Sequence, residues 1–169
     1  AKAEYVQLVD VNHAISSAFN FVNVPSAAWI DEAGQIVRID EGTYAKTHPF
    51  GGNDVYAPAL KDWVRNGADS QYVQSAATVA KNIRRRSAAE AQSEPAFKLG
   101  NYFRAQGQAD KAEEYWAMAR TLNPDSINFF RQDLTLSAEG SAGEAFVGMF
   151  KDYAAQGKHY YRPLDLDEK

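Results

Sequence analysis

The chain has 169 residues with 18 basic and 22 acidic side chains, which gives a net charge of −4. This acidic balance argues against a general nucleic-acid binder, and no apolar run approaches the ~20 residues that cross a bilayer. The absence of cysteine excludes a disulfide, a thiolate nucleophile and a cysteine-ligated metal. With 45% hydrophobic residues, the chain can form one compact domain or a small domain with an appendage.

The first predicted elements are a strand and a short helix. Residues 5–9 (YVQLV) are apolar and favour a strand, which ends at Asp10. Either Asp10 or Asn12 can cap a helix over residues 13–19. Because a helix between two strands usually connects parallel neighbours, we expect a parallel crossover here.

A β-hairpin is predicted next. Residues 27–30 read as a buried strand, residues 31–34 as a tight turn, and residues 35–39 as the returning strand. The step Val24-Pro25 leads into the first strand, so the hairpin is entered through a proline.

A loop and a helix follow the hairpin. The composition of residues 41–56 changes to Gly, Thr, His, Pro, Asn and Asp, which predicts a loop longer than most connections. A helix over residues 57–65 is ended by Asn66-Gly67. Its predicted inward side chains are Leu60, Trp63 and Val64.

The remainder of the chain is predicted to be helical. The expected helices cover residues 70–90, 94–106, 108–121, 126–137 and 141–155. The run Arg84, Arg85 and Arg86 lies near the end of the first helix, and a solvated face aided by the helix dipole is favoured over an anion or partner site. Ser141 and Glu144 form a capping-box pattern, and Gly157 ends the last helix.

The run LVDVNHAISSAFNFVNVPSAAWIDEAGQIVRIDEG resembles the C-terminal half of a thioredoxin-like redoxin domain of the AhpC/TSA type. The matching residues are Val24, Pro25, Ile30, Asp31, Gly34, Ile36, Val37 and Arg38. The resemblance covers roughly residues 5–66. It implies a cis Val24-Pro25 bond, with the residue before the proline pairing its backbone with substrate beside a Cys-x-x-Cys helix. The alternative is that Pro25 merely shapes the start of a strand.

One departure from the redoxin pattern is severe. The family's first strand and its cysteine-bearing helix precede the part seen here, and that strand lies between the strand like residues 5–9 and the strand like residues 27–30. Three hypotheses follow. The chain is a truncated or proteolytic fragment, or a second polypeptide or an exchanged copy completes the sheet, or the two strands close up directly.

The segment EPAFKLGNYFRAQGQADKAEEYWAMARTLNPDS resembles one tetratricopeptide repeat. The matching residues are Leu99, Gly100, Phe103, Gly107, Ala112, Trp116, Ala119 and Pro124. Gly100 and Ala112 are small where two antiparallel helices cross closely, and Leu99, Phe103 and Trp116 are expected to fill the space around them. The alternative is an ordinary helical hairpin. Since one repeat does not stand alone, the neighbouring helices are expected to cover its faces.

Other groups give little sign of chemistry. The histidines are His13, His48 and His159, none at metal-ligand spacing, and His13 is expected to be a surface or capping residue. The sequence His48-Pro-Phe-Gly-Gly52 lacks the Lys and Ser/Thr of a phosphate-binding P-loop. The acidic pairs Asp31-Glu32 and Asp40-Glu41 are expected to be solvated hairpin ends.

Together these observations predict an α/β region followed by an all-α region. The expected domains are a partial thioredoxin-like domain at 1–67, a helical repeat-like region at 68–157 and a surface or partly disordered tail at 158–169. The resemblance implies a thiol-disulfide oxidoreductase or peroxiredoxin-like protein, inactive as this chain, with Val24 and Pro25 as substrate-binding residues. The alternative is a non-enzymatic interaction module.

No catalytic residue, metal or cofactor is expected in the chain itself. The expected partner is a protein or peptide, with no nucleic acid and no membrane span. The lack of an export signal in the sequence gives a lean toward the cytoplasm, and the missing initiator Met suggests processing or a longer parent.

Overall fold

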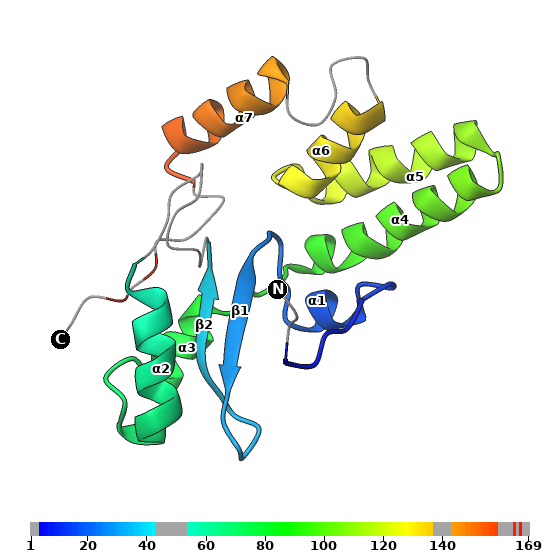
Figure 1. Ribbon diagram of the computed structural model, residues 1–169. Coiled ribbons are helices and arrows are strands. Elements are labelled where there is room, and N and C mark those ends of the chain that lie inside the picture. The colour runs from blue at the N-terminus through cyan, green and yellow to red at the C-terminus, as the bar shows by residue number, and fades with distance from the viewer. Residues whose placement is uncertain (1–3, 43–53, 137–142, 159–163, 165, 167–169) are drawn as a thin grey trace. The chain divides into compact units, whose positions relative to one another are not determined.

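The computed structural model describes residues 4–42, 54–136, 143–158, 164 and 166. The chain divides into two compact units, which are unit 1 (residues 1–84 with 162–169) and unit 2 (residues 85–161). Unit 1 holds a two-stranded antiparallel sheet with helices, and unit 2 is helical in its described part (Figure 1). The predicted order of an α/β region followed by helices is therefore correct.

The N-terminal segment differs from the prediction. Residues 5–9 form no strand, and their apolar side chains are at least three-quarters exposed. The following helix, α1 (Ala14–Ala18), is present and is capped by Asp10. The Asp10 carboxylate accepts from the backbone N–H groups of Ala14, Ile15 and Ser16 at 2.8, 3.1 and 3.0 Å. The predicted parallel crossover is wrong for the described residues, because their sheet contains no parallel pair.

The predicted hairpin is confirmed. Strand β1 (Ser26–Ile30) pairs antiparallel with β2 (Ile36–Glu41), and a register shift lies at Trp29/Ile30 (Figure 1). The carboxylate of Asp31 accepts from the N–H groups of Ala33 and Gln35 at 3.0 and 2.8 Å. Gly34 has φ of 78°, a conformation that costs glycine little. These local features fix the turn and with it the register.

One face of the hairpin packs against α2 (Tyr56–Asn66), which ends at Gly67 as predicted. Trp29 is 3% exposed, stacks on Trp63 with ring centroids 5.0 Å apart, and donates from Nε1 to Tyr56 Oη at 2.9 Å. The predicted inward side chains Leu60 and Val64 are instead 37% and 74% exposed. The reason is that Trp29 meets the face of α2 formed by Tyr56, Ala59 and Trp63.

The predicted long helix over residues 70–90 is also wrong. A short 3-10 turn, η1 (Gly67–Asp69), precedes a non-helical stretch with a turn, and α3 (Ala76–Asn82) is a separate helix. The Oγ atom of Ser75 accepts from Thr78 N–H at 3.1 Å and so caps the start of α3. The prediction placed residues 68–84 with the helical region, but their contacts place them in unit 1.

The C-terminal tail was expected on the surface. Of its residues, Leu166 is 4% exposed and belongs to the buried cluster of unit 1, together with Trp29, Tyr56, Ala59 and Tyr72. Leu164 also packs against this cluster. The two described tail residues of unit 1 therefore contribute to its core.

Unit 2 begins with an antiparallel helical hairpin of α4 (Ala88–Ala105) and α5 (Ala109–Leu122). Ser87 and Glu90 form a capping box at the start of α4. Gly100 lies so close to Trp116 that a Cβ atom placed there would be 2.3 Å from Trp116 Cδ1. Gly107 has φ of 73° in the connecting turn, so the helix crossing and the turn both need glycine.

The residues predicted around this helix crossing are buried only in part, since Phe103 is half-buried and stacks on Tyr115. Ala112, Trp116 and Ala119 are at most 4% exposed. Leu99, which was expected to fill the space around the crossing, is 41% exposed. It lies on another side of α4 from Gly100, because neighbours in sequence are about 100° apart around a helix.

Two further helices complete the described part of unit 2. Helix α6 (Ile127–Leu136) packs Phe129 on Phe97 of α4, with ring centroids 4.6 Å apart. Arg120 of α5 donates to Asp133 of α6 at 2.8 Å. Helix α7 (Glu144–Ala155) is followed by Gly157 with φ of 69°. The predicted capping residue Ser141 lies outside the described residues.

Across the described part of the chain, no helix combines the length and apolar character that a bilayer crossing needs.

Candidate functional site

The step before β1 forms what we call the proline corner (residues 23–26). The Val24-Pro25 peptide bond is cis, as the resemblance implies. The side chain of Val24 is 83% exposed, whereas Asn23 beside it is 5% exposed. The carbonyl of Pro25 accepts from Gly42 N–H at 3.1 Å, which ties the corner to the end of β2. The corner therefore presents Val24 outward from a fixed backbone.

A network of polar side chains stabilises the proline corner. Ser26 Oγ lies 2.9 Å from the carbonyl oxygen of Asn23 and 2.8 Å from its Oδ1, and donates to them. Asn23 Nδ2 donates to Glu41 Oε2 at 3.3 Å. Glu41 is 3% exposed, so its charge requires a partner.

The partner of Glu41 is Arg84. Its Nε donates to Oε1 at 2.7 Å and a terminal nitrogen donates to Oε2 at 2.8 Å, so the guanidinium is bidentate. The carbonyl of Arg84 in turn accepts from Asn20 Nδ2 at 2.7 Å. This arrangement connects the segment after α3 to β2 and to the chain leading into the corner.

The arginine run was expected to be a solvated face at a helix end, and this is correct only in that Arg85 and Arg86 are exposed. The three arginines lie in the non-helical segment between α3 and α4. Arg84 holds Glu41, and Arg86 lies 3.1 Å from Glu94. Arg85 alone of the three is exposed without an ion pair in the described part of the chain.

The second acidic pair was also expected to be solvated. Asp31 and Glu32 do lie in the exposed turn, but Asp40 and Glu41 are 6% and 3% exposed. Asp40 accepts from Arg38 Nε at 2.6 Å, and Arg38 also donates to the carbonyl of Tyr72 at 2.9 Å. Arg38 is 2% exposed and its guanidinium lies over the ring of Trp29. Two carboxylates of β2 therefore form ion pairs, one within the strand and one with Arg84.

The sheet has one covered edge and one open edge. On the outer side of β2, Gln74 N–H donates to the carbonyl of Val37 at 2.9 Å. On the outer side of β1, no strand of the described residues pairs with Ser26–Ile30. The third hypothesis, that residues 5–9 and β1 close up directly, is therefore wrong for the described residues.

The burial of Tyr56 next to this site changes its acidity. Burial raises the pKa of the Tyr56 phenol, while the hydrogen bond from Trp29 acts to lower it. The nearby Asp40 carboxylate raises it further and Arg38 lowers it. The phenol remains protonated at neutral pH and accepts the indole hydrogen bond.

Comparison of the chain with protein-family models, curated proteins and solved structures finds no match.

Of the three histidines, only His13 lies among the described residues, and it adds no chemistry to this geometry. His13 lies at the start of α1, is exposed and makes no side-chain cap, since Asp10 performs that role. His48, His159 and Gly51-Gly52 lie outside the described residues. Within the described ranges, no group of three or more His, Asp or Glu side chains could hold a metal ion.

Sequence reasoning found part of the site and missed the rest. The Val-Pro step and the hairpin turn are local patterns and were found. The Glu41–Arg84 pair joins residues 43 positions apart. The Arg38–Asp40 pair could have been found from the alternation of side chains along β2, which puts both residues on one face of the sheet.

Proposed function

We propose that unit 1 is part of a thioredoxin-like thiol-disulfide oxidoreductase or peroxiredoxin-like protein, inactive as this chain. The redox cysteines would come from outside the sequence, and Val24 with Pro25 would contact substrate. The observation that carries this proposal is the open edge of β1 directly after an exposed Val24. A strand added at that edge would lie next to the corner, where an attacking thiol would have to be.

Two further features support the proposal. First, β1 (SAAWI) carries no charged side chain, although free edge strands are commonly protected by charge. Second, residues 5–9 expose Tyr5, Val6, Leu8 and Val9 by 76–86%. An apolar strand-favouring segment and an uncharged strand edge both call for a partner strand. That strand belongs to a longer parent protein, a second polypeptide or an exchanged copy.

The experiment starts with the natural source. Intact-mass analysis is expected to find a polypeptide longer than this chain that contains Cys-x-x-Cys. A disulfide-reduction assay on insulin is expected to show turnover by that polypeptide and none by the chain alone. Turnover by the chain alone contradicts the proposal. A sole gene product that begins at Ala1 contradicts the longer parent protein, and the cysteines would then have to come from a second polypeptide.

The substrate role of the corner is tested in the active polypeptide. Val24→Glu is expected to raise KM for the disulfide substrate because it changes the outward side chain at the corner. Val64→Glu is the matched control, because Val64 is a valine on α2 that is 74% exposed. If the two substitutions change KM equally, the proline corner does not contact the substrate.

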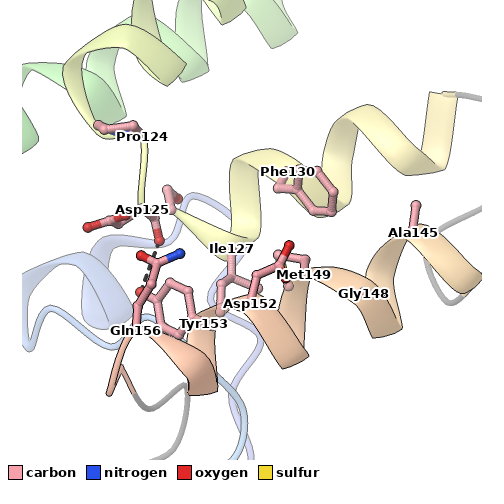
Figure 2. A pocket seen from close by; sticks show the side chains of 11 residues that line it. Pro124, Asp125, Ile127, Phe130, Ala145, Gly148, Met149, Asp152, Tyr153 and Gln156 are labelled. Carbon is pink, nitrogen blue, oxygen red and sulfur yellow. Dashed lines mark hydrogen bonds between the residues drawn. The ribbon is translucent and has the colours of Figure 1, made fainter.

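A second candidate function is that of an interaction module, as the resemblance of α4–α5 to a tetratricopeptide repeat implies. The supporting observation is a groove of about 380 Å³ between α6 and α7, which we call the α6–α7 groove. Figure 2 shows Ile127 and Phe130 of α6 opposite Met149 and Tyr153 of α7. A groove of this size accepts a peptide side chain or a short peptide segment.

A further inference from the structure

The α6–α7 groove has an apolar floor. Ile127, Phe130 and Met149 line it, and Ile127 is 6% exposed. Ala145 and Gly148 of α7 keep the floor open, and a Cβ atom at Gly148 would meet no other atom within 4 Å. The floor therefore has room for an apolar side chain of moderate size.

Both ends of the groove are held by contacts between its walls. At one end, the Arg131 guanidinium of α6 lies 4.9 Å from the ring centroid of Phe146 of α7. At the other end, Tyr153 Oη donates to the carbonyl of Asp125 at 3.2 Å, and Lys158 Nζ lies 2.6 Å from Asp125 Oδ1. These contacts connect the two walls of the groove.

The ionised side chains that line the groove are both acidic. They are Asp125, which shares its charge with Lys158, and Asp152, which forms no ion pair in the described part of unit 2. Asp152 is exposed at the rim and Figure 2 places it beside Met149. The rim therefore offers a negative charge next to an apolar floor.

We infer that the α6–α7 groove binds a peptide segment that carries an apolar side chain next to a lysine or arginine. The apolar side chain fills the space over Gly148, and the cation pairs with Asp152. This inference rests on the second proposed function and specifies its ligand. Charge complementarity decides between ligand classes, because an acidic peptide would meet the Asp152 carboxylate at the rim, and no lysine or arginine is among the residues that line the groove.

The test uses the full chain and three synthetic peptides with identical leucine positions, whose remaining positions are lysine, glutamine or glutamate. Binding is followed by fluorescence anisotropy at low and high NaCl concentration. The lysine peptide is expected to bind most tightly, and its affinity is expected to fall with salt, since the rim charge is exposed to solvent. Equal or tighter binding of the glutamate peptide overturns the inference.

Variants assign the binding to the groove. Gly148→Leu fills the floor of the groove and is expected to lower the affinity for the lysine peptide by about tenfold or more. Asp152→Asn is expected to lower the affinity for the same peptide by about fivefold. Glu114→Gln on the exposed side of α5 removes the same charge outside the groove and is expected to change nothing. Unchanged binding by Gly148→Leu or Asp152→Asn overturns the inference.

A charge reversal protects the test against loss of folding. Asp152→Lys alters an exposed side chain, so the chain is expected to remain folded and to prefer the glutamate peptide. If all three peptides bind equally and Gly148→Leu abolishes that binding, the groove is a peptide site but the charge inference fails. If no peptide binds, the inference fails and the interaction function loses its supporting observation.

Discussion

The two units reach a buried interior by different means. Unit 1 buries Arg38, Asp40 and Glu41 within a hairpin of two strands, so charge pairs contribute to its interior. Unit 2 closes α4 on α5 with glycine and alanine at the crossing and Trp116 against them. Removing one member of a buried ion pair strands a charge, whereas enlarging a small residue at a helix crossing creates a steric clash. Substitutions should therefore destabilise the two units for different reasons. Trp29 and Trp63 report on the unfolding of unit 1, and Trp116 reports on that of unit 2.

The largest effect is expected from Arg38→Ala. It leaves Asp40 buried without its cation, which costs about 3–5 kcal/mol of unfolding free energy. The NMR indole signals of Trp29 and Trp63 should lose their native positions at lower urea concentration, while that of Trp116 should not. Arg85→Ala, at an exposed arginine, is the control. Coincident loss of all three signals would contradict independent units.

The corresponding change in unit 2 is Gly100→Ala. Its Cβ atom would lie 2.3 Å from Trp116 Cδ1, so α4 and α5 must separate, at a cost of about 1–3 kcal/mol. The indole signal of Trp116 measured in urea should report this loss. Gly148→Ala on α7 meets no atom and is expected to stabilise its helix by about 0.5–1 kcal/mol. If Gly100→Ala leaves the stability in urea unchanged, the close approach of α4 to α5 does not restrict this position to glycine.

A smaller effect is expected from Tyr56→Phe. The substitution keeps the ring but removes the acceptor of the Trp29 Nε1 hydrogen bond, which costs about 1–2 kcal/mol. Urea unfolding followed through the Trp29 indole signal measures it. Tyr5→Phe, at a tyrosine that is 76% exposed, should leave stability unchanged. Equal stability of the two variants would show that the buried indole finds another acceptor.

The smallest effect concerns pH and α1. The backbone N–H group of Ser16, with those of Ile15 and Ala14, holds the pKa of Asp10 below its ordinary value. Because the folded pKa is lowered, this stabilisation is present above the unfolded pKa of about 3.9 and is lost as pH falls through the folded pKa. The amide shift of Ser16 should titrate with that lowered midpoint in an NMR series. A midpoint at the ordinary aspartate value, or an unchanged amide shift in Asp10→Asn, would contradict the cap.

What could be predicted from the sequence was local. The turn at Asp31 and Gly34, the glycine at Gly107 and the small residues at the helix crossing each have a cause within a few residues. The conformation of residues 5–9 could not be predicted, because a β-strand forms only where a partner strand pairs with it. The long helix over residues 70–90 was predicted from apolar spacing, but the capping serines Ser75 and Ser87 start two separate helices.

Part of the candidate site was predictable in the same sense. The Val24-Pro25 step is a sequence pattern, but the network behind it is not. Glu41 reads as a turn residue until Arg84 is known to lie beside it. Leu60 and Val64 were predicted to face inward together with Trp63, but only Trp63 stacks on Trp29. The position of Trp29 decides the inward face of α2, and that position is a tertiary fact.

The burial of Leu166 in unit 1 has a consequence for the order of folding during synthesis. Unit 2 is encoded between the two parts of unit 1, so all of its helices leave the ribosome before Leu166 does. Domains can fold as units while the chain is still growing. Unit 2 can therefore complete its core first, although the hairpin of unit 1 is made earlier, and the N-terminal unit acquires its final buried side chain last.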